Sequence, residues 1–228
     1  MTKLIKEIND HINIDKVRYI DNFEYKESHY ASMDFPEVGK IDLFKIVSEP
    51  NKNSSSETKN ELLYLQSLTN NRSKQELDLI YTVDTDPMIL FKDVISKYNL
   101  EFPAKFFTSM YYTCAIAIVD HLKFYYNRAR PYQLAEHYGI SINRIITKTH
   151  KTPAYPSGHT MYAALISQIL SDKYPRHKTE FAKLVDLCGK ARELQGVHYP
   201  SDNAAAKQII STIYPELKQY YIGVGHEL

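Results

Sequence analysis

The amino-acid sequence predicts an all-α fold: a single-domain helical bundle with a partly irregular N-terminal arm. The first observation is periodicity, because from Glu57 onward apolar residues recur at the three- and four-residue spacing of amphipathic helices. The second is size, because 228 residues are enough for one sizeable hydrophobic core. We therefore treat residues 1–228 as one domain, in which residues 1–56 form the arm and residues 104–213 hold the most distinctive motifs.

The N-terminal arm is expected to begin with a short amphipathic helix over residues 1–16. Residues 17–45 are rich in tyrosine and aspartate and are interrupted by Pro36 and Gly39. We expect irregular structure there, with room for one or two short strands. Residues 49–56 are polar and end in serines that suit the N-cap of a following helix.

The helices after the arm are predicted from apolar stripes and from prolines at their first turns. Leu62 and Leu65 belong to one such stripe, which continues after a polar break at residues 70–73. Pro87 and Pro103 each suit the start of a helix. The predicted spans that follow are residues 88–98, 104–126, 160–170, 179–194 and 202–213.

Composition and charge exclude several classes of protein. A formal net charge of +1 and a pI near 7.7 give no electrostatic reason to expect nucleic acid as a partner. The two cysteines, Cys114 and Cys188, form neither a disulfide framework nor a CxxC metal pair. Residues 1–16 lack the apolar core of a signal peptide, and the longest apolar stretch, residues 110–119, is too short to span a bilayer. We therefore expect a soluble, cytoplasmic protein without a membrane partner.

The segment Pro156-Ser157-Gly158-His159 lies where a polar stretch turns into the apolar residues 161–170. We interpret it as the start of a buried helix. Free backbone N–H groups and the helix dipole favour an anion at such a place, and Gly158 allows a ligand to approach the backbone closely. The plainer interpretation is an ordinary helix start, with Ser157 as the N-cap and His159 exposed.

Two further segments supply basic residues and a second histidine. Lys123 and Arg130 are seven residues apart, so on a helix they share a face at a separation of about 10 Å. Arg192 is expected in the last turn of a helix, followed by His198 and, four residues later, by Asp202, whose carboxylate can fold back onto the imidazole. Taken singly, these residues are better explained as a solvated basic face and as a carboxylate that caps the last helix.

Taken together and in this order, the patterns Lys-x6-Arg-Pro, Pro-Ser-Gly-His and Arg-x5-His-x3-Asp resemble the signature of the type 2 phosphatidic acid phosphatase (PAP2) superfamily. That superfamily includes soluble bacterial class A acid phosphatases, membrane lipid phosphatases and vanadium-dependent haloperoxidases. The resemblance covers residues 123–202 and is closest to the class A acid phosphatases, because Tyr155, Thr160 and Tyr199 flank the motifs. One position departs from the pattern, since the family usually has serine where Ala191 stands.

The resemblance implies a phosphatase that hydrolyses small phosphate esters through a phosphohistidine intermediate. Phosphoryl transfer requires that the charge on three equatorial oxygens is neutralised while the attacking and leaving atoms stay in line. His198, paired with Asp202, is the expected nucleophile, and His159 is the expected general acid. The expected phosphate-binding residues are Lys123, Arg130, Ser157, Gly158 and Arg192.

No metal or cofactor is expected, because the cations can do the electrostatic work of a metal ion and the sequence has no HExxH motif or Cys/His cluster. The expected partner is a small phosphorylated molecule, and self-association among the class A relatives allows a homo-oligomer. The first alternative is a vanadium haloperoxidase that binds vanadate through His198 in the same pocket. The second is a non-catalytic protein that binds a phosphorylated ligand. His137 and His150 are expected at the surface.

Overall fold

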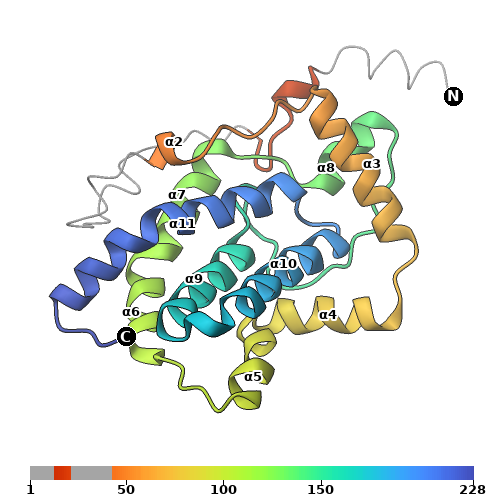
Figure 1. The fold of residues 1–228 in the computed structure, drawn as a ribbon. Coiled ribbons are helices and arrows are strands. Elements are labelled where there is room, and N and C mark those ends of the chain that lie inside the picture. The colour runs from red at the N-terminus through yellow and green to blue at the C-terminus, as the bar shows by residue number, and fades with distance from the viewer. Residues whose placement is uncertain (1–12, 22–42) are drawn as a thin grey trace, which may run out of the picture.

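The computed structural model describes residues 13–21 and 43–228, and all regular structure within these ranges is helical (Figure 1). This confirms the predicted all-α fold. The helix predicted over residues 1–16 and the irregular region over residues 17–45 lie mainly outside the described residues. Their described parts are a 3-10 turn, η1 (Ile14–Lys16), and a short helix, α2 (Leu43–Ile46).

The amphipathic segments predicted after the arm form helices, most of them within a few residues of the predicted bounds. Serine side chains start two of them, since Ser55 caps the first and Ser73 forms a reciprocal capping box with Glu76 in the second. The helices are α3 (Ser56–Asn70), α4 (Lys74–Thr85), α5 (Met88–Lys97), α6 (Ala104–Met110), η4 (Tyr111–Ala115), α7 (Ile116–Tyr126), α8 (Pro131–Ala135), η5 (Glu136–Tyr138), α9 (Gly158–Lys173), η6 (Pro175–His177), α10 (Lys178–Leu194) and α11 (Pro200–Gly223).

Helix α9 is the centre of the fold, and it packs against both α10 and α11 (Figure 1). Ten of its 16 residues are buried, so it is enclosed around most of its circumference. Leu165, Ile166 and Ile169 are fully buried, and each contributes about 1.5–3 kcal/mol of hydrophobic stabilisation. The first turn of α9, at Gly158, is therefore anchored inside the hydrophobic core.

The segment predicted as one helix over residues 104–126 contains a π-helical turn, η4. The Ile116 N–H bonds to the Tyr111 carbonyl, five residues earlier, instead of the carbonyl four residues earlier. The Thr113 hydroxyl donates to the Ser109 carbonyl at 2.5 Å, and so takes the acceptor that the Thr113 N–H would use in an α-helix. Periodicity alone does not predict this turn, because the apolar residues continue through it.

Helix α11 continues to Gly223, beyond its predicted end at residue 213. Pro215 lies inside the helix and removes one backbone hydrogen bond. The helix continues because Leu217 and Tyr221 are buried against the rest of the core. Neither α11 nor any other helix in the described ranges is long and apolar enough to cross a membrane.

Candidate active site

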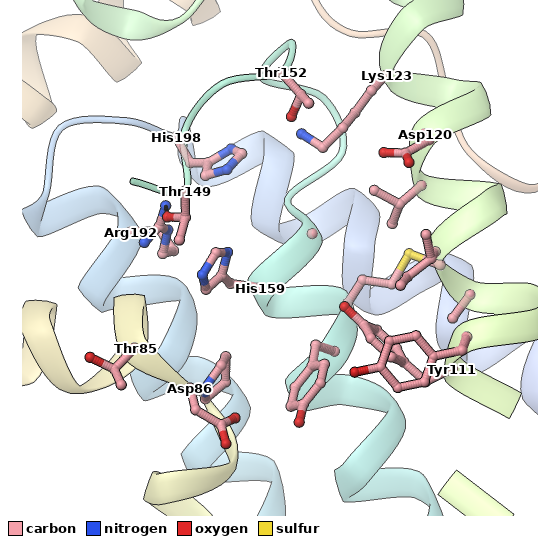
Figure 2. A pocket seen from close by; sticks show the side chains of 18 of the residues that line it. Thr85, Asp86, Tyr111, Asp120, Lys123, Thr149, Thr152, His159, Arg192 and His198 are labelled. Carbon is pink, nitrogen blue, oxygen red and sulfur yellow. Dashed lines mark hydrogen bonds between the residues drawn. The ribbon is translucent and has the colours of Figure 1, made fainter. Parts of the chain in front are cut away.

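Six of the eight predicted site residues line one cavity of about 500 Å³ (Figure 2). They are Lys123, Arg130, Gly158, His159, Arg192 and His198. Ser157 and Asp202 are fully buried and stand behind the cavity wall. The structure therefore brings together residues from α7, the start of α9, the end of α10 and the α10–α11 connection.

The first turn of α9 presents its backbone to the cavity at Gly158 and its imidazole at His159. The Ser157 side chain is the N-cap of α9, accepting from the Thr160 N–H, and its hydroxyl also lies 3.0 Å from the Thr160 hydroxyl. The structure thus gives Ser157 the capping contact of the plainer interpretation. Its role as a phosphate ligand stays a prediction.

One loop, residues 147–153, supplies uncharged oxygen acceptors to all three cations. The Arg130 Nε and Nη2 donate to the Thr152 carbonyl at 3.0 and 2.8 Å. The Lys123 ammonium donates to the Pro153 carbonyl, and Arg192 Nη2 donates to the Thr149 hydroxyl at 3.2 Å. Neutral acceptors hold these side chains in place without cancelling their charge, so that charge remains available to an anion.

The three cations differ in how they are paired. Arg192 Nη1 lies 2.9 Å from the Asp84 carboxylate, whereas Lys123 and Arg130 have no carboxylate within ion-pair distance among residues 13–21 and 43–228. Burial and the neighbouring Arg192 lower the pKa of Arg130 to about 10, and burial and Arg130 lower the pKa of Lys123 well below its usual range. Lys123, Arg130 and Arg192, which we call the phosphate cradle, therefore carry more positive charge than the one paired carboxylate neutralises.

His198 is held between a carboxylate and a guanidinium. Its Nδ1 lies 3.0 Å from Asp202 Oδ2, and its Nε2 lies 2.8 Å from Arg130 Nη1. Because a guanidinium can only donate, Nε2 must be the unprotonated nitrogen and Nδ1 must carry the proton that Asp202 accepts. Asp202 thus fixes the tautomer in which Nε2 has a free electron pair.

Asp202 is in turn held by Arg128, which the sequence analysis did not single out. Arg128 Nη1 lies 2.6 Å from Asp202 Oδ1, and its guanidinium stacks over the Tyr199 ring at 3.9 Å. Burial raises the pKa of Asp202 to about 6, while Arg128 and the Tyr199 N–H act to lower it. The carboxylate is therefore ionised at neutral pH because these donors offset part of the cost of burial.

Burial and nearby positive charge keep both histidines uncharged near neutral pH. Burial lowers the pKa of His159 well below its usual range, and Arg192, Lys123 and Arg130 lower it further. Burial and the same three cations have this effect on the pKa of His198. An anion bound among the cations would oppose this effect and favour the protonated form of either imidazole.

Residues 105–212 match the sequence profile of the PAP2 superfamily. That match begins in α6, ends in α11 and contains every residue predicted for the site. The match spans 108 of the 228 residues, a little under half of the chain.

Two curated relatives of this chain are the non-specific acid phosphatases of Salmonella typhimurium and Salmonella typhi. Each is 32% identical over 108 residues, which are 47% of this chain and 41% of the relative's length. Among solved structures, the transmembrane PAP2-type phosphatidylglycerolphosphate phosphatase from Bacillus subtilis aligns over 100% of this chain and 96% of its own. It does so with a TM-score of 0.38 and 16% sequence identity.

Two carboxylates reach the site from outside the matched region. Asp84, at the end of α4, accepts hydrogen bonds from Arg192 and from the Thr147 and Thr149 hydroxyls. Burial acts to raise the pKa of Asp84, but these hydrogen bonds outweigh it and lower the pKa to about 2. Glu61, on α3, lies 3.3 Å from Arg128 Nη2. The helices before the matched region therefore complete the charge network of the site.

His150 corrects one expectation, because it is buried rather than at the surface. It lies in the 147–153 loop, where its Nδ1 is 3.3 Å from the Thr147 hydroxyl. Burial, together with Arg130 and Arg192, lowers the pKa of His150 to about 4. A buried neutral imidazole thus lies close enough to Arg130 and Arg192 to feel their charge, without adding to it.

Proposed function

We propose that this chain hydrolyses small phosphate monoesters through a phosphohistidine on His198, with His159 as the acid and no metal ion. The observation that carries the proposal is the cavity itself, where two histidines and three cations surround one space of about 500 Å³. The relatives named as acid phosphatases support the same reaction class, although they match the chain over less than half of its length.

In the first step, the phosphoryl group binds among Lys123, Arg130 and Arg192, and its oxygens accept their hydrogen bonds. Arg130 then exchanges its contact with His198 Nε2 for a phosphate oxygen, which exposes the electron pair of Nε2. Nε2 attacks phosphorus while the bond to the ester oxygen breaks. Asp202 accepts the Nδ1–H throughout and stabilises the phosphorylated imidazolium ring.

The leaving oxygen takes a proton from His159 as the ester bond breaks. His159 is neutral in the empty site, so it must gain this proton when the anionic substrate arrives. A bound phosphate ester offsets the charges of Lys123, Arg130 and Arg192, which lower the pKa of His159 in the empty cavity. Substrate binding therefore prepares its own general acid.

In the second step, a water molecule replaces the departed alcohol. Neutral His159 takes one proton from the water, and the water oxygen attacks phosphorus as the bond to His198 Nε2 breaks. Inorganic phosphate and neutral His198 are the products. Two in-line displacements give overall retention of configuration at phosphorus.

Metal-independent catalysis follows from the source of positive charge. Lys123, Arg130 and Arg192 together provide the electrostatic stabilisation that a divalent cation gives in other phosphoryl-transfer sites. We expect phosphate release to continue in EDTA and to be blocked by vanadate, which binds as a five-coordinate analogue of the transition state.

The test is phosphate release from p-nitrophenyl phosphate by the wild type and by His198→Ala, with His137→Ala as a control away from the cavity. His198→Ala should lower kcat by at least about 10³-fold, because the nucleophile is lost, while inorganic phosphate still binds. His137→Ala should match the wild type, and rapid quenching should trap an acid-labile phosphoryl group on His198. Full activity in His198→Ala would overturn the proposal. Bromide oxidation by vanadate-loaded protein, without phosphate release, would favour the haloperoxidase instead.

A further inference from the structure

The cavity extends beyond the phosphate cradle into an outer region, which is lined by tyrosines and two carboxylates. Its walls include Tyr111, Tyr112 and Tyr162, with Asp86 and Asp120 at different edges. Figure 2 shows Asp120 near Lys123. Asp86 and Tyr111 lie on different walls of the cavity, and both are farther from His198 than Asp120 is. If the phosphoryl group binds at His198, the rest of the substrate must occupy this outer region.

The outer wall is built by residues that recur at helical spacing. Tyr112, Ile116, Asp120 and Lys123 are separated by four, four and three residues, and all four line the cavity. The π-helical turn η4 adds Tyr111 to the same wall beside Tyr112. One helical face therefore runs from the cation of the cradle to the aromatic rim.

The tyrosines form a packed edge-to-face group rather than separate surface rings. Tyr111 lies 4.7 Å from Tyr162 at 86° and 5.1 Å from Tyr112 at 74°, measured between ring centroids and planes. Tyr112 is 66% exposed at the outer end of this group. Such an arrangement offers ring faces and edges to another aromatic ring, and its electron-rich faces attract a cation.

The carboxylates make this outer region negative, in contrast to the cradle. Asp120 is half-buried, and no residue in the described ranges donates a hydrogen bond to it; burial raises its pKa, while Lys123 acts to lower it. Asp86 Oδ1 accepts from the Met88 N–H at 2.8 Å, at the start of α5. Its carboxylate also raises the pKa of Tyr162, after the larger effect of burial. Asp120 thus lies beside the cationic end of the cavity, and Asp86 lies at a different edge, farther from the cations.

We propose that Asp86, Asp120 and the three tyrosines form a leaving-group subsite that selects phosphate esters of aromatic alcohols bearing a positively charged substituent. This proposal rests on the proposed function and specifies its substrate class. The aromatic ring packs against the tyrosines, and the carboxylates at the two edges of the cavity attract the cation. A leaving group with a second negative charge, such as another phosphate, is repelled by the same carboxylates.

The test compares three phenyl phosphates that differ only in their para substituent: 2-aminoethyl, 2-hydroxyethyl or carboxymethyl. One or two methylene groups separate the charged or polar group of each substituent from the ring, so the leaving phenols have similar reactivity while their charge changes from positive to neutral to negative. The wild type should show the highest kcat/KM for the cationic ester and the lowest for the anionic one. We expect each step in charge to change kcat/KM about fivefold, and less at high salt.

The matched variants are Asp86→Asn and Asp120→Asn, with the exposed Asp93→Asn on α5 as a control for net charge. Asparagine can still cap α5 through its side-chain oxygen, so Asp86→Asn removes only the charge. Each variant should lower kcat/KM for the cationic ester about fivefold, mainly through KM, and change the neutral ester less than twofold. Asp93→Asn should retain the wild-type preference.

The outcomes separate this inference from the proposed function. No phosphate release from any of the three esters would overturn the phosphatase proposal itself. Hydrolysis of all three with equal kcat/KM would overturn the subsite and leave the phosphatase proposal standing. An equal loss for all three esters in Asp120→Asn would show that Asp120 acts only as a counter-charge for Lys123, which would also overturn its role in selection.

Discussion

Replacing Arg128 by methionine tests whether His198 depends on an ionised Asp202 and whether Arg128 keeps it ionised. The Arg128 and Asp202 side chains are both buried and lie 2.6 Å apart at their nearest atoms. With the charges centred roughly 4 Å apart and an effective dielectric constant of about 20, their attraction is about 4 kcal/mol. That energy corresponds to about 3 pKa units.

The loss of Arg128 should therefore raise the pKa of Asp202 from about 6 to about 9. At pH 7 about 1% of the variant would then hold the ionised carboxylate that orients His198, against about 90% of the wild type. The value of kcat/KM for p-nitrophenyl phosphate should fall about 100-fold at pH 7 and recover towards pH 9. The ratio of activities at the two pH values does not depend on the fraction of protein that folds.

Glu61→Gln provides the opposing control. The Glu61 carboxylate acts to raise the pKa of Asp202, so its neutralisation should move the acid limb of the pH profile to lower pH. Arg128→Met and Glu61→Gln are thus expected to shift the same limb in opposite directions. A uniform loss of activity in Arg128→Met, with the pH profile of the wild type, would refute the reasoning and leave Arg128 with a purely structural role.

Other changes near the site have equally definite expected outcomes. Wild-type kcat/KM should decline below a pH of about 6 as Asp202 gains a proton, which a pH–rate profile measures. The folded-state pKa of Asp84, about 2, lies below its ordinary value of 3.8, so its carboxylate stabilises the fold above pH 4 and this contribution is lost as the pH falls towards 2. Asp84→Asn should therefore have a lower Tm than the wild type at neutral pH and a smaller fall in Tm across that range. Gly196 has φ +77°, and an added Cβ would lie 2.9 Å from Ile142 Cγ2, so Gly196→Ala should lower the free energy of unfolding by about 1–3 kcal/mol in urea denaturation. Gly139→Ala, at φ +67° with open space around it, isolates the backbone cost and should lose less.

Local sequence patterns predicted the helices well where one apolar face decides the structure. The end of α10 is an example, because the helix ends at Leu194, the last residue of its predicted span, and Gly196 follows with the positive φ that is typical just past a helix. The patterns failed where contacts between residues far apart in the sequence determine the structure. Buried Leu217 and Tyr221 carry α11 past Pro215, and a threonine hydroxyl accompanies the π-helical turn in η4.

The candidate site shows the same division. The three motifs, joined by their resemblance to one family signature, contain the six predicted residues that face the cavity. Arg128 and Asp84 were missed because their partners are 74 and 108 residues away in the sequence. A signal for Arg128 was present, since it lies between Lys123 and Arg130 in the same basic segment. For Asp84 the sequence indicated only a turn before Pro87.

The neutral acceptors of the 147–153 loop imply a trade-off between stability and activity. They hold Lys123 and Arg130 close together without a carboxylate, so the empty site retains electrostatic repulsion that folding must overcome. Any oxyanion that fills the site relieves this repulsion, and at 100 times its Kd such a ligand adds about 2.7 kcal/mol to the free energy of unfolding. The heat resistance of this protein should thus depend on the phosphate around it, and apolar replacements of the two cations would increase stability at the expense of turnover.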